Sequence, residues 1–449
     1  MEVSNFGLFV VPHLRHIARR SCSLKFTVYR ITYHVDNPSP EPHVRVPQVP
    51  KALPSLEREK HLRSSKTTPI KKDPIISNDS NHRQSIKVSI TNVLEGSISD
   101  VSHFTCRDPF QTEFGVEMIG IKIGWKEWGD PNGPVILLCP SFSMGCHARS
   151  TANEPTPGWW EGMVGDDLAL DTKKYRIICP DILGAPFTTT NATSINPETQ
   201  RNWGPDFPII TPVDQVRVHK RLLEHLGIKK IKAVVGASLG GMQALTFAAE
   251  FPDSVEKVIA LCTTAQSSPT TIAFRYVQKL AIRSDPNFNG GRYSPDGPPL
   301  HGLAVARALG TICYRSRAEF DERFQWSPLH VNQKDVSYDV ESYLNAQASK
   351  FNRQYDANCY LTLSRCADLQ DLARGHDSYE EGVGRIQAEA LLMGFTHDAL
   401  IPSTELKRVQ NVLHSRGVRA EYVESDSLLG HDAFLKEWKW MTDHIRSFL

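Results

Sequence analysis

The chain has 449 residues, of which 22% are charged and 40% are hydrophobic, as is usual for a globular protein with a sizeable core. Its formal net charge of +1 provides no overall basic field, which argues against nucleic acid as a partner. No apolar run approaches the roughly 18 residues that a membrane-spanning helix needs, so the sequence also argues against an integral membrane protein. The nine cysteines show no CxxC pair and no zinc-type spacing, which indicates free thiols and no metal site.

The N-terminal segment is basic and nearly free of acids. Arginine and lysine residues recur up to Arg30 against the single acid Glu2, and Val10, Leu14 and Ile17 fall on one stripe of a short helix. This combination is typical of mitochondrial transit peptides, so we predict one over residues 1–36 and a mitochondrial location. The alternative is a disordered basic tail on a cytoplasmic protein.

Residues 37–104 are rich in proline, serine and lysine and have little apolar periodicity, as in NPSPEPHVRVPQVPKALP. Such a segment buries too little apolar surface to offset the entropy lost on ordering. We therefore predict a disordered linker over this range.

The rest of the chain alternates short apolar runs with helix-like stretches. The runs PVILLCP, YRIICPD, IKAVVG, VEKVIALCT and AEALLMGF suit strands of a buried parallel sheet, and the alternation over residues 115–130 suggests a pair of edge strands. This order predicts an α/β fold with a mostly parallel central sheet, covering residues 105–265 and 376–449. Residues 266–375 break the rhythm and are predicted to form a helical insertion, or lid.

The fragment GASLG places Ser238 between two glycines, at the junction of a predicted strand and a predicted helix. The pattern G-x-S-x-G is frequent by chance, but in this context it indicates the strained turn that exposes a nucleophilic serine. Glycine on both sides avoids collisions between the strand and the helix. The Leu239 N–H at the start of the helix would then face developing negative charge.

A serine nucleophile needs a base and a carboxylate that orients the base. Asp398 follows the apolar run ALLMGF, and His431 follows AEYVES, so the chain order is Ser, Asp, His, as in α/β-hydrolases. We predict His431 as the general base and acid and Asp398 as its orienting partner. The loop PSFSMGCH follows an early strand, which makes the Phe142 N–H the candidate for the second oxyanion-hole donor.

Seven longer segments carry a more specific resemblance. The chain resembles the homoserine O-acetyltransferases and their relatives that acylate serine, in segments that run from about residue 110 to the C-terminus: PGWWEGMVGDDLALDTKKYRIICPDILGAPF, SINPETQRNWGPDFPIITPVDQVRVHKRLLEHLGI, VVGASLGGMQAL, DPNFNGGRY, YDANCYL, MGFTHDALIP and GHDAFL. This resemblance implies an α/β-hydrolase fold with a helical lid and a homodimer packed through the lids. It implies no metal and no bound cofactor, with acetyl-CoA or another acyl-CoA as co-substrate and the hydroxyl of an amino acid as acceptor.

The resemblance also assigns residues by position. Ser238, Asp398 and His431 fall on the triad of the family, and Asp432 falls where a carboxylate meets the substrate's amino group. Lys279 takes the place of an arginine that grips the substrate carboxylate, which leaves serine and homoserine both open as acceptors. Tyr293 falls near the same pocket.

The leading prediction is therefore an acyl-CoA-dependent O-acetyltransferase that acts on L-serine or L-homoserine through an acyl-serine intermediate, in cysteine or methionine biosynthesis. The alternatives are transfer from succinyl-CoA, transfer to a specialised-metabolite alcohol, an esterase that admits water, and a scaffold without catalytic activity. An intact set of serine, aspartate and histidine argues against the scaffold.

Overall fold

A computed structural model describes residues 100–324, 326, 328–331 and 335–449. The predicted transit peptide (1–36) and nearly all of the predicted linker (37–104) lie outside this range. The first strand, β1 (Ser102–Cys106), begins just before the predicted end of the linker, because its mixed sequence SHFTC lacks the apolar pattern that marks the other strands. Among the described residues, no helix has the length and hydrophobicity needed to span a bilayer.

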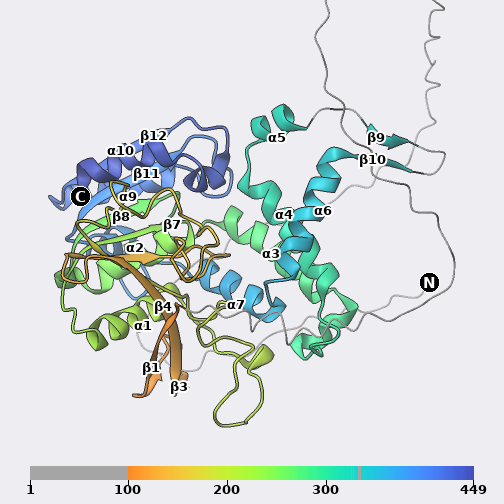
Figure 1. Ribbon diagram of the computed structural model, residues 1–449, viewed down its shortest axis with the longest axis horizontal. Coiled ribbons are helices and arrows are strands. Elements are labelled where there is room, and N and C mark those ends of the chain that lie inside the picture. Colours follow the sequence, from red (N-terminus) through yellow and green to blue (C-terminus); the bar gives the residue numbers. More distant parts are fainter. Residues whose placement is uncertain (1–99, 325, 327, 332–334) are drawn as a thin grey trace, which may run out of the picture. The chain divides into compact units, whose positions relative to one another are not determined.

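An eight-stranded sheet forms the centre of the fold (Figure 1), in the order β1-β4-β6-β5-β7-β8-β11-β12. The strands after β1 are β4 (Ile121–Gly129), β5 (Val135–Cys139), β6 (Arg176–Pro180), β7 (Ile231–Ala237), β8 (Val255–Leu261), β11 (Glu389–Phe395) and β12 (Ala420–Ser425). Strand β4 pairs antiparallel with both of its neighbours, and all other pairs in this sheet are parallel. The prediction of an α/β fold with a mostly parallel central sheet is confirmed.

The pair of edge strands predicted over residues 115–130 is wrong in its arrangement. Strand β4 lies second in the sheet, between β1 and β6. Strand β3 (Glu117–Met118) pairs instead with β2 (Phe110–Gln111) in a separate two-stranded sheet. The alternating pattern of this stretch could not reveal β1, which supplies the real edge.

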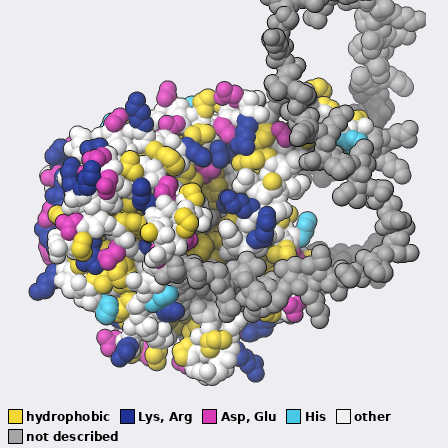
Figure 2. Space-filling view, in the orientation of Figure 1, with side chains coloured by type: hydrophobic (Ala, Val, Ile, Leu, Met, Phe, Trp, Pro, Cys, Tyr) yellow, Lys and Arg dark blue, Asp and Glu magenta, His cyan; other side chains and the backbone are white. Residues whose placement is uncertain are grey.

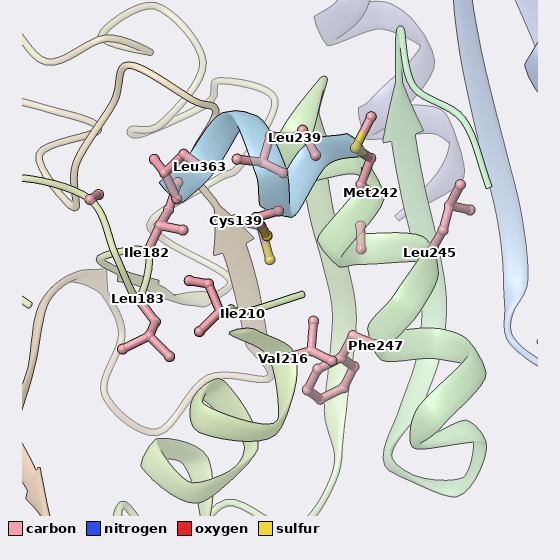
Figure 3. Close-up of a cluster of buried hydrophobic side chains, with 14 of the residues drawn as sticks. Cys139, Ile182, Leu183, Ile210, Val216, Leu239, Met242, Leu245, Phe247 and Leu363 are labelled. Atoms are coloured by element: carbon pink, nitrogen blue, oxygen red, sulfur yellow. The ribbon is translucent and has the colours of Figure 1, made fainter. Parts of the chain in front are cut away.

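Both faces of the sheet are buried. In β5, Leu137 and Cys139 belong to one hydrophobic cluster, whereas Ile136 and Leu138 belong to the other, as the two-residue period of a strand requires. Helices α1 (Pro212–His225), α2 (Leu239–Glu250) and α9 (Thr404–Ser415) contribute to the first cluster, and α10 (Trp438–Phe448) contributes to the second. Figure 3 shows part of the first cluster, with side chains from α1 and α2 beside those of the strands and loops.

The insertion, residues 266–375, joins β8 to β11. It contains α3 (Pro269–Arg283), α4 (Leu300–Tyr314), α5 (Arg317–Arg323), α6 (Asp339–Asn352) and α7 (Ala357–Asp368), with a hairpin of β9 (Pro328–Val331) and β10 (Val336–Tyr338) between α5 and α6. Helices α3, α4 and α6 pack together beside the sheet domain (Figure 1). Helix α7 contributes Leu363 to the same buried cluster as Leu239 of α2, so the insertion is continuous with the core (Figure 3).

Candidate active site

Ser238 occupies a sharp bend between β7 and α2. Its backbone has φ 54° and ψ −121°, a region that residues with a side chain rarely adopt. A Cβ atom on Gly236 would lie 2.1 Å from the Gly240 carbonyl oxygen, and one on Gly240 would lie 2.1 Å from the Cys139 carbonyl oxygen. The two glycines are therefore required by the close approach of the strand and the helix.

The structure brings the side chains of Ser238, Asp398 and His431 together from three separate strand ends. Asp398 lies in the loop after β11, and His431 lies in a short 3₁₀ helix (Gly430–Leu435) that follows β12. His431 Nδ1 is 2.6 Å from Asp398 Oδ2, and His431 Nε2 is 2.8 Å from Ser238 Oγ. This is the geometry of a serine nucleophile with a base and an orienting carboxylate.

Hydrogen bonding at Asp398 determines which histidine nitrogen carries the proton. Asp398 Oδ1 accepts from the Leu400 and Ile401 N–H groups, each at 2.9 Å, which fixes the carboxylate. An ionised carboxylate only accepts, so His431 Nδ1 donates to Asp398 and Nε2 is free to accept the Ser238 proton. Burial alone would lower the pKa of His431, but the charge and hydrogen bond of Asp398, together with the charge of Asp432, raise this pKa above its usual value.

Two backbone N–H groups beside Ser238 are available for an oxyanion. Leu239 is the first residue of α2, and Phe142 lies in the loop that follows β5. Among the described residues, neither N–H donates a hydrogen bond. Both residues line the cavity over Ser238, so they can meet the charge that develops on a tetrahedral intermediate.

A cavity of about 120 Å³ opens over the nucleophile, between the core and the insertion. Apolar side chains form most of its wall, and Figure 2 shows hydrophobic groups gathered in a recess between these two parts of the chain. Besides Ser238, His431 and two serines, the polar side chains on the wall are Arg275, Gln278, Arg307, Tyr314, Tyr360 and Asp432.

Known proteins share this architecture over most of their length. The family model for the alpha/beta hydrolase fold matches residues 134–437. A homoserine O-acetyltransferase from Symbiobacterium thermophilum is 41% identical over 356 residues, which cover 77% of this chain and 93% of that protein. This chain belongs to the homoserine O-acetyltransferase family.

Other relatives show the range of activities around this family. A serine O-succinyltransferase from Litchfieldella anticariensis is 38% identical and covers 76% of this chain and 96% of its own length. The solved homoserine O-acetyltransferase from Bacillus anthracis superposes with a TM-score of 0.74 at 28% identity, covering 78% of this chain and 97% of that one. A solved esterase has a TM-score of 0.72 at 30% identity, covering 78% and 99% of the two chains.

In this member of the homoserine O-acetyltransferase family, Arg307 is a cation in the pocket without an acidic partner. Its guanidinium lies 4.8 Å from the centre of the Phe351 ring and 5.7 Å from that of Tyr314, and its Nε is buried without a hydrogen-bond partner. No salt bridge to Arg307 occurs in the part of the chain that the structure describes. A guanidinium with a buried Nε and no acidic partner favours an anionic ligand group.

Asp432 provides the opposite charge in the same pocket. Its Oδ2 lies 3.0 Å from Arg315 Nε. Burial raises the pKa of Asp432, while Arg315 and the neighbouring His431 oppose this shift. Asp432, which the resemblance assigned as a substrate-binding carboxylate, thus lies on the cavity wall.

The structure corrects the predicted role of Lys279. Lys279 does not line the cavity; its ammonium binds Asp368 Oδ2 outside it. Arg275, one turn earlier on α3, lines the cavity and also binds Asp368, with Nε 3.0 Å from Oδ1. Arg275 and Lys279 thus share Asp368, a partner that lies 93 residues beyond Arg275 in the chain and that no spacing along α3 could reveal.

Tyr293 is corrected as well. Its hydroxyl donates to Asp356 Oδ2 at 2.6 Å and accepts from the Asn358 N–H at 3.0 Å, at the start of α7. It therefore supports the N-terminus of that helix and does not line the cavity. Arg307 and Tyr314 were not predicted from the sequence, although Arg307 is a single arginine within the apolar run GLAVARALG of α4, a pattern that singles it out.

One set of side chains in the described part of the chain could jointly hold a metal ion. The donor atoms of Cys262, Asp398 and His431 all lie within 4.8 Å of one another. Asp398 and His431 already hydrogen-bond to each other, and burial raises the pKa of the Cys262 thiol well above its usual range. A protonated thiol is a poor ligand, so these residues suit the triad better than a metal centre.

Proposed function

We propose that this protein is an acyl-CoA-dependent O-acyltransferase whose acceptor is the hydroxyl of L-serine or L-homoserine. One observation carries the proposal: a single cavity holds the nucleophile Ser238, its base, and fixed charges of both signs. A hydrolase of simple esters needs no such charges, whereas an amino acid presents a carboxylate and an ammonium group beside its hydroxyl. Arg307 suits the carboxylate and Asp432 suits the ammonium.

The reaction proceeds in two halves through the same residues. His431 Nε2 takes the proton of Ser238 as the oxygen attacks the thioester carbonyl, and the Leu239 and Phe142 N–H groups hold the oxyanion. The CoA thiol leaves with the proton from His431, so Ser238 carries the acyl group. The acceptor hydroxyl then gives its proton to His431 and attacks the acyl ester, and Ser238 recovers a proton as the product leaves.

The test is a panel of donors and acceptors. The purified chain is incubated with acetyl-CoA or succinyl-CoA, and with L-serine, L-homoserine or no acceptor, while release of free CoA is measured. We expect CoA release to depend on one of the two amino acids and O-acyl amino acid to accumulate in equal amount. CoA release that is fast without an acceptor and unchanged by either amino acid would identify a hydrolase instead.

A second candidate donor, succinyl-CoA, is favoured by Arg275. Asp368 carries one negative charge and is shared by Arg275 and Lys279, so this group keeps a net positive charge next to the cavity. Gln278, one turn from Arg275, accepts a hydrogen bond from Tyr360 on the same wall. Arg275 and Gln278 thus form a second polar group on the cavity wall, on a different helix from Arg307. Its positive charge suits the terminal carboxylate of a succinyl chain.

Replacement of Arg275 by glutamine tests the donor. If succinyl-CoA is the donor, Arg275→Gln is expected to lower kcat/KM for succinyl-CoA by about ten- to a hundredfold, as for loss of a charged hydrogen bond of roughly 1.5–3 kcal/mol, and to change acetyl-CoA turnover little. Asp368 keeps Lys279 as its partner, so no unpaired charge is buried. The matched variant Lys279→Gln removes the other cation and should leave the donor ratio unchanged; an equal shift in both variants would contradict the assignment.

We also propose that the protein is a homodimer that associates through the insertion. Helices α3 and α4 expose a set of large apolar side chains, each 45–56% accessible: Tyr276, Val277, Leu280, Val305 and Ile312. Exposed apolar groups gathered on two packed helices are typical of an interface. Sedimentation or light scattering should give twice the mass of one chain, and Val277→Asp together with Leu280→Asp should halve it; a wild-type monomer at micromolar concentration would contradict the proposal.

The proposed location is the mitochondrion, on the composition of residues 1–36. Fusion of these residues to a fluorescent protein should direct it to mitochondria in eukaryotic cells. A fusion in which Arg15, Arg19 and Arg20 are replaced by glutamine should remain in the cytoplasm. Cytoplasmic fluorescence of the unchanged fusion would favour the basic tail.

A further inference from the structure

The loop that carries the Phe142 N–H, here called the oxyanion loop (residues 140–148), has no regular secondary structure. It is therefore held by individual hydrogen bonds. From the core, Ser141 Oγ donates to the Ala237 carbonyl at 2.6 Å, and the Cys146 N–H donates to the buried carboxylate of Asp181. These two bonds fix the ends of the segment that contains Phe142.

The bond to Phe142 itself comes from the insertion. Tyr355, between α6 and α7, donates its hydroxyl proton to the Phe142 carbonyl oxygen at 2.7 Å. Arg307 also reaches the loop from the insertion, but it contacts the side chain of Ser143 and at 3.4 Å. Among the described residues, the Tyr355 hydroxyl is thus the group of the insertion that hydrogen-bonds to the backbone of this loop.

The surroundings of Tyr355 leave its hydroxyl little freedom. The ring is 6% exposed, stacks on Phe351 with centroids 4.5 Å apart and planes at 16°, and lies nearly parallel to the Phe142 ring at 6.0 Å. Phe187 and Tyr360 meet it edge-on. Burial raises the pKa of Tyr355 well above its usual range, which favours the protonated hydroxyl that donates this bond.

We propose that Tyr355 is a positioning residue, whose hydroxyl holds the oxyanion loop from the insertion so that the Phe142 N–H faces the reacting carbonyl. The peptide that carries the Phe142 N–H is held by the Met144 N–H, which donates to the Ser141 carbonyl at 2.9 Å, and Tyr355 holds the next peptide through the Phe142 carbonyl. The oxyanion hole is therefore complete only when the insertion lies against the core. This inference rests on the proposed use of Phe142 in catalysis.

The test is Tyr355→Phe, which removes one oxygen and keeps the stacked ring. The probe is p-nitrophenyl acetate, because acylation of Ser238 by this ester requires the triad and the oxyanion hole but neither CoA nor an amino acid. Failure of the proposed transferase activity would therefore leave this test intact. We expect the acylation and deacylation rate constants each to fall roughly fivefold, the effect of one ordinary hydrogen bond, while KM changes less than twofold.

The matched control is Thr246→Val. This change also removes one buried hydroxyl that bonds across the boundary between core and insertion, from Thr246 Oγ1 to Gln370 Oε1 at 3.3 Å, but among the described residues neither of these side chains hydrogen-bonds to the oxyanion loop. We expect a similar decrease in melting temperature with both rate constants within twofold of the wild type. Unchanged rate constants in Tyr355→Phe, an equal loss in the control, or a wild-type chain that the ester does not acylate would each overturn the inference.

Discussion

Replacement of Ser238 by alanine is expected to lower turnover by about a millionfold, as removal of the nucleophile does in other triad enzymes. His431 and Asp398 stay in place, but no acyl group can be held between the two half-reactions. Intact-protein mass spectrometry after incubation with acetyl-CoA or succinyl-CoA should show an acyl adduct on the wild type and none on Ser238→Ala. The fold should be unaffected, because alanine is smaller than serine and lacks only the hydroxyl group.

The residues of a triad act as a unit, so their losses should not add. His431→Ala and the double variant are expected to have about the same residual activity as Ser238→Ala. A Ser238→Ala variant that keeps more than a thousandth of the activity would show that another group supplies the nucleophile, and the same result for His431→Ala would show that another group supplies the base. A double variant far weaker than either single one would show that the two residues act independently.

Replacement of Asp398 by asparagine should lower kcat by about 10⁴, since asparagine would favour the wrong histidine tautomer. The asparagine oxygen can still accept from the Leu400 and Ile401 N–H groups, so the loop is retained. Its amide nitrogen would donate to His431 Nδ1, leaving the proton on Nε2, where Ser238 needs an acceptor.

The same variant should change the pH profile in a defined direction. His431 acts as a base only when neutral, and Asp398 raises its pKa, so kcat/KM of the wild type should rise with pH through a midpoint above that of an ordinary histidine. Asp398→Asn removes the raising charge while burial continues to lower the pKa, so the midpoint should move to lower pH. Asp443→Asn, on the exposed side of α10, is the control; an unmoved midpoint in Asp398→Asn would contradict the assignment of His431.

The sheet and the positions of Ser238, Asp398 and His431 were readable from the sequence because each depends on local patterns. Short apolar runs mark the buried strands, and parallel strands bring their carboxyl ends to one edge, where all three residues lie. The tight glycines around Ser238 follow from the same local geometry.

The surroundings of Arg275, Lys279 and Tyr293 were harder to predict from the sequence, because their partners lie in distant segments of the chain. Arg275 and Lys279 both bind the carboxylate of Asp368, and the hydroxyl of Tyr293 donates to Asp356. These contacts join segments 63 to 93 residues apart in the chain. A spacing rule along one helix cannot reveal which of two neighbouring cations turns toward a cavity.

The triad and the arginines of the cavity wall come from different parts of the chain. The nucleophile, its base and the orienting carboxylate come from the ends of core strands, whereas Arg275, Arg307 and Tyr314 come from α3 and α4 of the insertion. Substitutions on these two helices can therefore alter which molecules are accepted while Ser238, His431 and Asp398 stay unchanged. Such a division lets a lineage acquire a new substrate through changes on two helices, while it keeps the same reaction.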